Sequence, residues 1–339
     1  MILGNQVVSD PAKTQKILII RMLGLSDVTC IGIPAIRHFK SKFPEAEIHF
    51  LTYAEGKEMI SLAEPKIKVK FMEQGAWPDD FLLSVEAFLG LAEDIIGEAY
   101  TQIVNLDTWF MPCFLARFLK DVGEPVVGNY VGMSLQQIID QFQTQTLNAE
   151  YVNDPSEYIE SSFFSMPRWH SPWWEFGTLP DYGYPEFFLR FCCGFGDIDM
   201  DMSVKVTAND KLEKLRKRKK VVALATHART QDRIYPHGAK LEILLKKAGY
   251  EVWTGFDGSI AMRKTLAKLK ASDLLVTVPS APQWLATAVG CPSLVISGDV
   301  DPRTLMPDYA TEPSETPVSA EELVESIKSI FDETAAANG

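Results

Sequence analysis

The stretch "KILIIRMLGLSDVTCIGIPAIRHFKSKFPEAEIHFLTY", residues 16–53, decides the fold of this chain. It begins with an unbroken apolar run, passes through a loop of small residues, and ends with a second apolar run. Between the two runs, Ile36, Phe39 and Phe43 fall on one face of a helix. Continuous apolar strands separated by such a helix are typical of a buried parallel sheet. In these sheets ligands bind beyond the carboxyl ends of the strands, so chemistry is expected after Ile20.

The same alternation of strand and helix recurs along most of the chain. Lys alternates with apolar residues in "KIKVKFM" (66–72), which predicts a strand at the edge of the sheet. The runs "QIVNL" and "PVVGNY" predict further strands before residue 131, and from residue 221 onward four apolar strands alternate with three helices. We therefore predict an α/β protein with two Rossmann-like, doubly wound domains, one over 1–205 and the other over 206–339.

The composition is that of an ordinary globular protein with an acidic balance. Of 339 residues, 46% are hydrophobic and 23% are charged, and 45 acids against 33 bases give a net charge of −12. This charge argues against a nucleic-acid partner, which needs a basic face, and we interpret the basic run Lys214–Lys220 as the solvated end of a helix. No apolar run reaches the ~18 residues of a transmembrane segment, and the N-terminus lacks the apolar region of a secretion signal. The five cysteines lack the spacing of metal ligands, so we expect no metal site and a reduced, cytoplasmic location.

Residues 150–205 interrupt the alternation with a segment rich in aromatic residues, Pro and Gly. Two interpretations stay open. Either the rings fill a groove as part of a long connection between the domains, or Trp169, Trp173, Trp174 and Tyr182 form a surface on which a sugar or another acceptor stacks. Exposed rings at this density would otherwise reduce solubility, which is the argument for a ligand.

Asp27 stands just beyond the first predicted strand, in a loop with Gly24 and Ser26. Gly24 would let a ligand approach the backbone closely, and the amides at the start of the following helix would attract an anion. Pro34 predicts the first turn of that helix. From position alone, Asp27 is either a functional carboxylate or a simple cap of the helix.

Polar and cationic side chains also follow two strands of the second domain. The loop "THARTQDRIYPHG" (226–238) places Arg229 and Arg233 where cations could neutralise a diphosphate, although a solvated loop would look the same. Further along, Ser280 is predicted to cap a helix, with Gln283 completing a capping box. The free amides at that helix start would suit a phosphate.

These stretches together resemble the heptosyltransferase-like glycosyltransferases of family 9. The resemblance implies the GT-B fold, in which two Rossmann-like doubly wound domains face a central cleft. The resemblance lies in the opening strand, Arg, Ser/Gly loop and acid of residues 16–51, and it continues in "QIVNLDTWFMPCFLARFL", "VVALATHARTQDRIYPHGAKLEILLKKAGYEV" and "SDLLVTVPSAPQWLATAVGCPSLVISGDVDP". It covers most of both domains but not the aromatic segment. Ser26 stands where the family has glycine, and one extra residue separates Asp27 from Pro34.

The resemblance implies inverting, metal-independent and cofactor-independent transfer of a sugar from a nucleotide sugar (an ADP-sugar or another NDP-sugar) to a hydroxyl of a glycan, lipid or other acceptor. Asp27 matches the family's general base, and Arg233 stands in place of its lysine. The first domain would bind the acceptor and the second the donor. The residues expected at the acceptor are Arg21, Gly24, Ser26, Trp169 and Trp174. The residues expected at the donor are Thr226, Arg229, Arg233, Ser280, Ala281, Gln283 and Trp284.

The donor loop departs from the family's pattern Asp-Ser-Gly-Pro-x-His. This chain reads Pro-Ser-Ala-Pro-Gln-Trp over residues 279–284, so the acid, the glycine and the histidine are gone. Either the donor is not the family's usual ADP-heptose, or the protein binds a donor without turning it over. The alternative to an active enzyme is therefore a catalytically silent nucleotide-sugar-binding or assembly protein of the same fold. The acidic balance weighs against a third idea, a transferase that modifies DNA.

Overall fold

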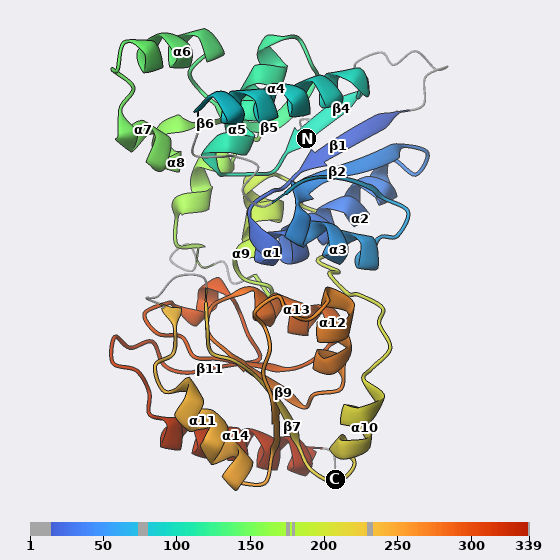
Figure 1. The fold of residues 1–339 in the computed structure, drawn as a ribbon, viewed down its shortest axis with the longest axis vertical. Coiled ribbons are helices and arrows are strands. Elements are labelled where there is room, and N and C mark those ends of the chain that lie inside the picture. The colour runs from blue at the N-terminus through green and yellow to red at the C-terminus, as the bar shows by residue number, and fades with distance from the viewer. Residues whose placement is uncertain (1–14, 74–80, 174–176, 178–179, 229–232, 338–339) are drawn as a thin grey trace. The chain divides into compact units, whose positions relative to one another are not determined.

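The computed structural model describes residues 15–73, 81–173, 177, 180–228 and 233–337, and of residues 81–86 only the backbone. It divides into two compact units, each built around its own sheet (Figure 1). The first unit comprises Met1–Ser171 and Phe188–Asp201, and the second comprises Pro172–Phe187 and Met202–Gly339.

The described strands of the first unit pair in the order β3-β2-β1-β4-β5-β6. They are β1 (Lys16–Ile20), β2 (Glu47–Tyr53), β3 (Lys68–Met72), β4 (Gln102–Asn105), β5 (Val126–Val131) and β6 (Ile159–Ser161). β1 to β5 run parallel, and β6 pairs antiparallel with β5. The edge position predicted for the Lys-alternating strand is confirmed, because β3 ends the sheet. The chain order reverses at β1, which lies between β2 and β4, and such a switch point is where parallel sheets bind ligands.

Helices cover both faces of this sheet, as the predicted doubly wound fold requires (Figure 1). They are α1 (Gly24–Asp27), α2 (Ile33–Lys42), α3 (Ala54–Ala63), α4 (Phe81–Gly97), α5 (Phe110–Asp121), α6 (Leu135–Gln143), α7 (Ala149–Asn153) and α8 (Pro155–Tyr158). Leu18 and Ile20 of β1 pack with α4 and α5, whereas Phe50 of β2 packs against Gly32 before α2 on the opposite face. The sequence did not predict α6, α7, α8 or β6.

The second unit repeats the plan with a different strand order, β11-β10-β9-β7-β8, all parallel. Its strands are β7 (Val221–Ala225), β8 (Glu251–Trp253), β9 (Leu274–Thr277), β10 (Ser293–Val295) and β11 (Tyr309–Ala310). Its helices are α9 (Tyr184–Glu186), α10 (Asp210–Arg216), α11 (Gly238–Lys247), α12 (Met262–Lys270), α13 (Ala281–Val289) and α14 (Ala320–Ala337). Here the switch point lies at β7, between β8 and β9.

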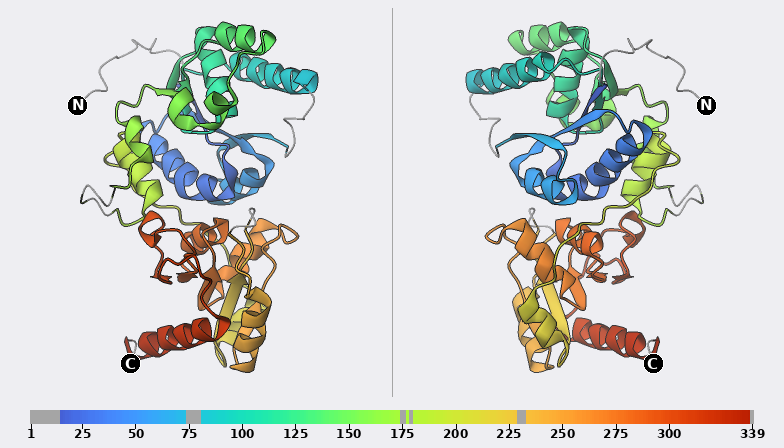
Figure 2. Two further views of the ribbon diagram at one scale, coloured as in Figure 1. Left: turned by 90° about the vertical axis from the view of Figure 1, so that its left-hand side faces the viewer. Right: turned by 90° about the vertical axis from the view of Figure 1, so that its right-hand side faces the viewer.

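Two helix pairs enclose the second sheet (Figures 1 and 2). α11 and α14 contribute Leu241, Leu245, Leu323 and Ile327 to one apolar cluster with the strands, and α12 and α13 pack together on the other side. The predicted basic run forms the end of α10 and leads into β7, as interpreted from the sequence. Among the described residues, no helix is both long enough and apolar enough to cross a bilayer.

The boundary predicted at residue 205 is not where the units divide, because residues 172–187 pack with the second unit. Trp173 stacks on Phe187, with ring centroids 4.8 Å apart. Gly183 has a φ of +58°, and a Cβ there would meet the carbonyl oxygen of Thr304 at 2.5 Å. This close backbone approach holds the segment against the second unit, so the aromatic stretch 150–205 is shared between the two.

Candidate functional site

The chain enters a helix after β1 earlier than the sequence predicts. Gly24, with a φ of +54°, begins the turn α1, and Asp27 ends it, so Asp27 is helical rather than in a loop. Residues Val28–Gly32 are π-helical, with the Ile33 N–H bonded to the Val28 carbonyl, and α2 follows directly. This wide turn holds one residue more than an α turn, and Pro34 follows it in the first turn of α2.

Asp27 forms an ion pair with Arg21, the first residue after β1. The Arg21 side chain is 0% exposed, and its Nη2 donates to Asp27 Oδ1 while its Nη1 donates to the Leu106 carbonyl. Its guanidinium carbon lies 5.2 Å from the centroid of the Phe188 ring. The alternative that the Asp27 side chain caps the helix is wrong, because Asp27 stands at the N-cap position of the π-helical turn but makes no side-chain cap hydrogen bond there. The acid instead keeps 20% of its side chain exposed beside a buried cation.

The surroundings raise the pKa of the Asp27 carboxyl above its ordinary value. Burial is the largest cause, and the negative charge of Asp107 adds to it. The Arg21 guanidinium and its hydrogen bond oppose the rise without cancelling it. A carboxylate with a raised pKa is a stronger base near neutral pH, which is the property that proton abstraction needs.

Asp107 is the residue of this site that sequence reasoning missed. It is fully buried just beyond β4, and its Oδ2 accepts the N–H groups of Met22 (2.5 Å) and Leu23 (3.1 Å). Its Oδ1 accepts the N–H groups of Thr108 (2.9 Å) and Trp109 (3.1 Å). One carboxylate therefore ties the segment after β1 to the segment after β4. The available signal was an acid directly following the apolar run "QIVNL".

Trp169 and Trp173, two of the aromatic residues predicted to stack a ligand, belong to different units. Trp169 lies in a 3-10 turn of the first unit, Met166–His170, with its ring centroid 4.1 Å from that of His170. Trp173 is buried in the second unit, and Trp174 lies outside the described residues. Gly24 and Ser26 stand beside Asp27 in α1, where both are half-buried.

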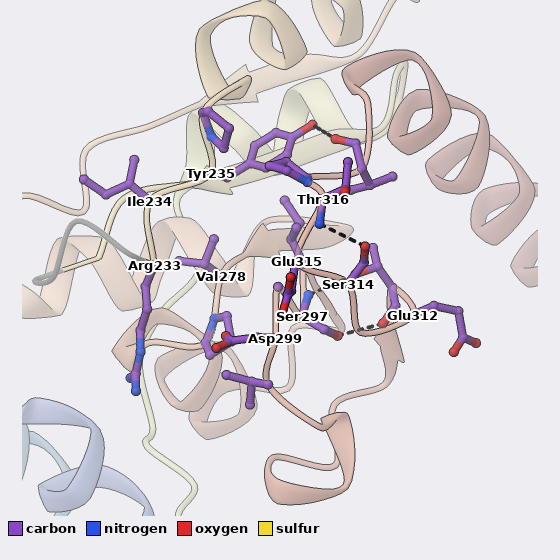
Figure 3. A pocket seen from close by; sticks show the side chains of 18 residues that line it. Arg233, Ile234, Tyr235, Val278, Ser297, Asp299, Glu312, Ser314, Glu315 and Thr316 are labelled. Atoms are coloured by element: carbon purple, nitrogen blue, oxygen red, sulfur yellow. Dashed lines mark hydrogen bonds between the residues drawn. The ribbon is translucent and has the colours of Figure 1, made fainter.

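The second unit has a cavity of about 310 Å³ at the carboxyl ends of its strands (Figure 3). Residues 233–236, 278–279, 296–300, 311–312 and 314–318 line it. Its walls are joined by the Tyr235 hydroxyl, which donates to the Val318 carbonyl (2.8 Å), and by Ser297, whose hydroxyl donates to the Thr311 carbonyl (2.7 Å). The cavity lies beside the β7–β9 switch point, the position expected of a nucleotide site.

The described lining of this cavity is more acidic than the sequence suggested. Arg233 is its cation, and Asp299, Glu312 and Glu315 are its acids. Carboxylates accept hydrogen bonds from ribose and sugar hydroxyls, whereas a diphosphate needs the guanidinium. Arg229, predicted beside Arg233, lies outside the described residues.

The other predicted donor residues do not line the cavity. Thr226 is buried, and its Oγ1 lies 2.4 Å from where a Cβ on Gly238 would be. The predicted capping box is wrong, because the Ser280 hydroxyl donates to the Val278 carbonyl (2.9 Å) and Gln283 Nε2 donates to the Leu305 carbonyl (3.1 Å).

The remaining part of the altered loop belongs to the core. Ala281 begins α13, and the Trp284 side chain is buried, so its ring is not exposed to stack on a donor base. Val278 and Pro279, just before the predicted residues, are the part of this loop that lines the cavity.

Comparison with solved structures confirms the predicted fold. The chain is similar to a family 9 glycosyl transferase from Veillonella parvula, at 11% identity and a TM-score of 0.61, over 94% of this chain and 97% of the other. It is similar to ADP-heptose lps heptosyltransferase II of E. coli, at 12% identity and a TM-score of 0.61, over 95% and 100%. It is also similar to E. coli heptosyltransferase WaaC with ADP, at 13% identity and a TM-score of 0.57, over 93% and 99%.

No family model matches the sequence, and neither does any curated protein. At these identities the structural likeness establishes the two-domain GT-B fold, and the chemistry has to be argued from the sites.

Proposed function

We propose that the protein is an inverting glycosyltransferase that moves a sugar from a nucleotide sugar to an acceptor hydroxyl, with Asp27 as the general base. The observation that supports this most is the Arg21–Asp27 pair at the switch point of the first sheet, where a partly exposed carboxylate has a raised pKa. A purely structural acid would gain more stability from full burial among hydrogen-bond donors, as Asp107 has.

In the proposed reaction Arg21 holds Asp27 through Oδ1, and Oδ2 accepts the proton of the acceptor hydroxyl. The acceptor oxygen forms a bond to the anomeric carbon from the face opposite the leaving group. The bond from that carbon to the diphosphate oxygen breaks, and its electron pair leaves with the nucleoside diphosphate. Arg233 neutralises the charge of this leaving group in the second unit, while the acids of the cavity bind hydroxyls of the donor. We propose that no metal or cofactor is required and that the protein acts in the cytoplasm.

The test begins with thermal shifts for ADP, UDP, GDP, CDP and dTDP and for their sugar conjugates. A ligand at a hundredfold excess over its Kd stabilises by about 2.7 kcal/mol, which raises the melting temperature by several degrees. Arg233→Ala should weaken the nucleotide that binds by about 1.5–3 kcal/mol, the range for a hydrogen bond to a charged group. Arg218→Ala removes an exposed arginine of the same unit and should leave affinity unchanged. Equal loss in both variants would remove Arg233 from the site.

Consumption of the donor is then measured with Asp27→Asn. We expect donor affinity to persist and turnover to fall by at least about a hundredfold, the low end for a general base. Asp140→Asn changes an exposed acid of α6 and should keep full turnover. Turnover with and without a chelator checks the proposed metal independence.

The second candidate, a silent nucleotide-sugar-binding or assembly protein, is favoured by the burial of Gln283 and Trp284 and by the acidic lining of the cavity. It predicts a thermal shift without consumption of any donor in the panel. Wild-type turnover in Asp27→Asn would instead leave an enzyme whose base lies elsewhere.

A further inference from the structure

Two aromatic rings meet across the end of β1, and neither was singled out from the sequence. Tyr53 is the last residue of β2, and Trp109 follows β4. Their centroids are 6.1 Å apart, with the planes at 65°. Because β1 lies between β2 and β4, side chains that meet from these two strands meet over the segment that carries Arg21 and Asp27.

The structure fixes both rings at this edge of the sheet. Tyr53 is the N-cap residue of α3, and Trp109 is the N-cap residue of α5, so both leave the sheet in extended backbone. The Trp109 N–H donates to Asp107, the carboxylate that also holds the backbone after β1. The next residue, Phe110, packs inward on Tyr158 with centroids 5.1 Å apart. Trp109 itself is 44% exposed.

The charges around the pair favour a neutral ligand. Arg21 is buried and engaged by Asp27, and the Lys57 ammonium of α3 lies 3.6 Å from the centroid of Phe71, on the edge strand β3. With both of these cations engaged, the Asp27 carboxylate and the two π-faces are available to a ligand. An aromatic face binds the apolar C–H face of a sugar ring, and a carboxylate binds its hydroxyls.

We propose that Trp109, with Tyr53 at its edge, is the stacking platform for the acceptor, and that the acceptor presents an uncharged pyranose ring whose hydroxyl faces Asp27. This inference rests on the proposed function, since it names the acceptor of that reaction. It places acceptor specificity on residues 53 and 109, outside the segment 150–205 where the sequence suggested stacking.

The test is saturation-transfer NMR on the full chain with methyl pyranosides of glucose, galactose, mannose and N-acetylglucosamine, and with methyl glucuronide as the acidic counterpart. We expect ring C–H signals from at least one neutral pyranoside and weaker signals from the glucuronide. Trp109→Ala should weaken binding about five- to tenfold, which corresponds to the loss of one aromatic contact, and Trp109→Phe should keep most of it. Phe164→Ala removes an exposed ring elsewhere in the first unit and should change nothing.

Equal signals from wild type and Trp109→Ala, or none from any neutral pyranoside, would overturn the proposal, as would preferential binding of the glucuronide. If Trp109→Ala does not fold, Tyr53→Leu tests the same platform. Nucleotide thermal shifts on the same samples separate the two proposals. If a variant loses pyranoside binding but still binds nucleotide, the result bears on the stacking platform alone. If no nucleotide binds to any sample, the result bears on the donor site of the proposed function.

Discussion

Replacing Arg21 by Met should destabilise the first unit by an amount that depends on pH. The substitution keeps a side chain of similar length against Phe188 but removes the cation from a partly buried carboxylate. Breaking a buried ion pair by removing one partner costs about 3–5 kcal/mol, because the remaining charge is uncompensated. We expect a loss in this range near pH 8. Once Asp27 is protonated, the remaining cost should approach about 1 kcal/mol for the lost hydrogen bond to Leu106.

The sign of the pH dependence comes from the raised pKa of Asp27. Burial raises this pKa and Arg21 opposes the rise, so removing Arg21 raises it further. A carboxyl whose folded pKa lies above its unfolded value of about 3.9 stabilises the fold fully at low pH. That stabilisation is lost as the pH rises through the folded pKa. The deficit of Arg21→Met should therefore grow between about pH 4 and pH 8.

Hydrogen exchange of peptides from β1 and β4 measures this deficit, because it reports on the first unit without assuming that the whole chain unfolds in one step. Adding Asp27→Asn to the Arg21→Met variant should recover part of the lost stability, since it removes the uncompensated negative charge. A deficit that is the same at both pH values, or strict additivity of Arg21→Met and Asp27→Asn, would refute the account of the pair as a coupled buried ion pair.

Two further changes test the packing and the electrostatics of the first unit. Gly128→Ala would place a Cβ 2.3 Å from a backbone carbonyl oxygen of β4 at a φ of +97°, whereas Gly123→Ala, at +94°, meets open space. In thermal unfolding, Gly123→Ala should lower the free energy of unfolding by about 1–3 kcal/mol through backbone strain alone, and Gly128→Ala should lower it distinctly more. Equal losses would show that the close contact at Gly128 adds nothing. Burial raises the pKa of Glu64, but hydrogen bonds from Lys40 and Arg37 bring it below its ordinary value. Glu64→Gln should therefore cost about 1–3 kcal/mol at pH 7, and its stability should converge with wild type as acid titrates the folded carboxyl; parallel acid-unfolding curves would show that the pairs contribute nothing.

The fold could be predicted because its information is local. Strands such as 221–225 and 274–277 are continuous apolar runs, and the helices between them show a clear period, so each element could be identified from its own residues. The lysine alternation even placed β3 at the edge. The segment 172–187 could not be assigned in this way, because its place depends on a close approach between Gly183 and the backbone of Thr304, more than a hundred residues further along.

The sites were predictable only where a motif marks them. Asp27 and Arg233 follow strands in stretches that resemble a known family, and the structure places one beside a buried arginine and the other on a cavity. Asp107 and Trp109 could not be recognised from their own stretch of sequence. They lie beside the segment after β1 only because β4 pairs with β1 in the sheet. The cavity wall at 311–312 and 314–318 carries no sequence signal, because its place beside the cavity comes from hydrogen bonds to β10 and the loop that follows it.

The two units have absorbed their departures from the family pattern in different ways. In the first unit, a π-helical turn directly follows Asp27, and Asp27 forms an ion pair with Arg21. In the second unit, the side chains of Gln283 and Trp284 in the altered loop are buried in the core. The cavity of this unit is lined by acids together with Arg233. A silent protein has no need to keep a buried, costly ion pair next to a π turn, since such pairs are weak contributors to stability. The Arg21–Asp27 pair and the acid-lined cavity are therefore consistent with the proposed transfer from a donor other than ADP-heptose, and the nucleotide that the cavity accepts becomes the decisive measurement.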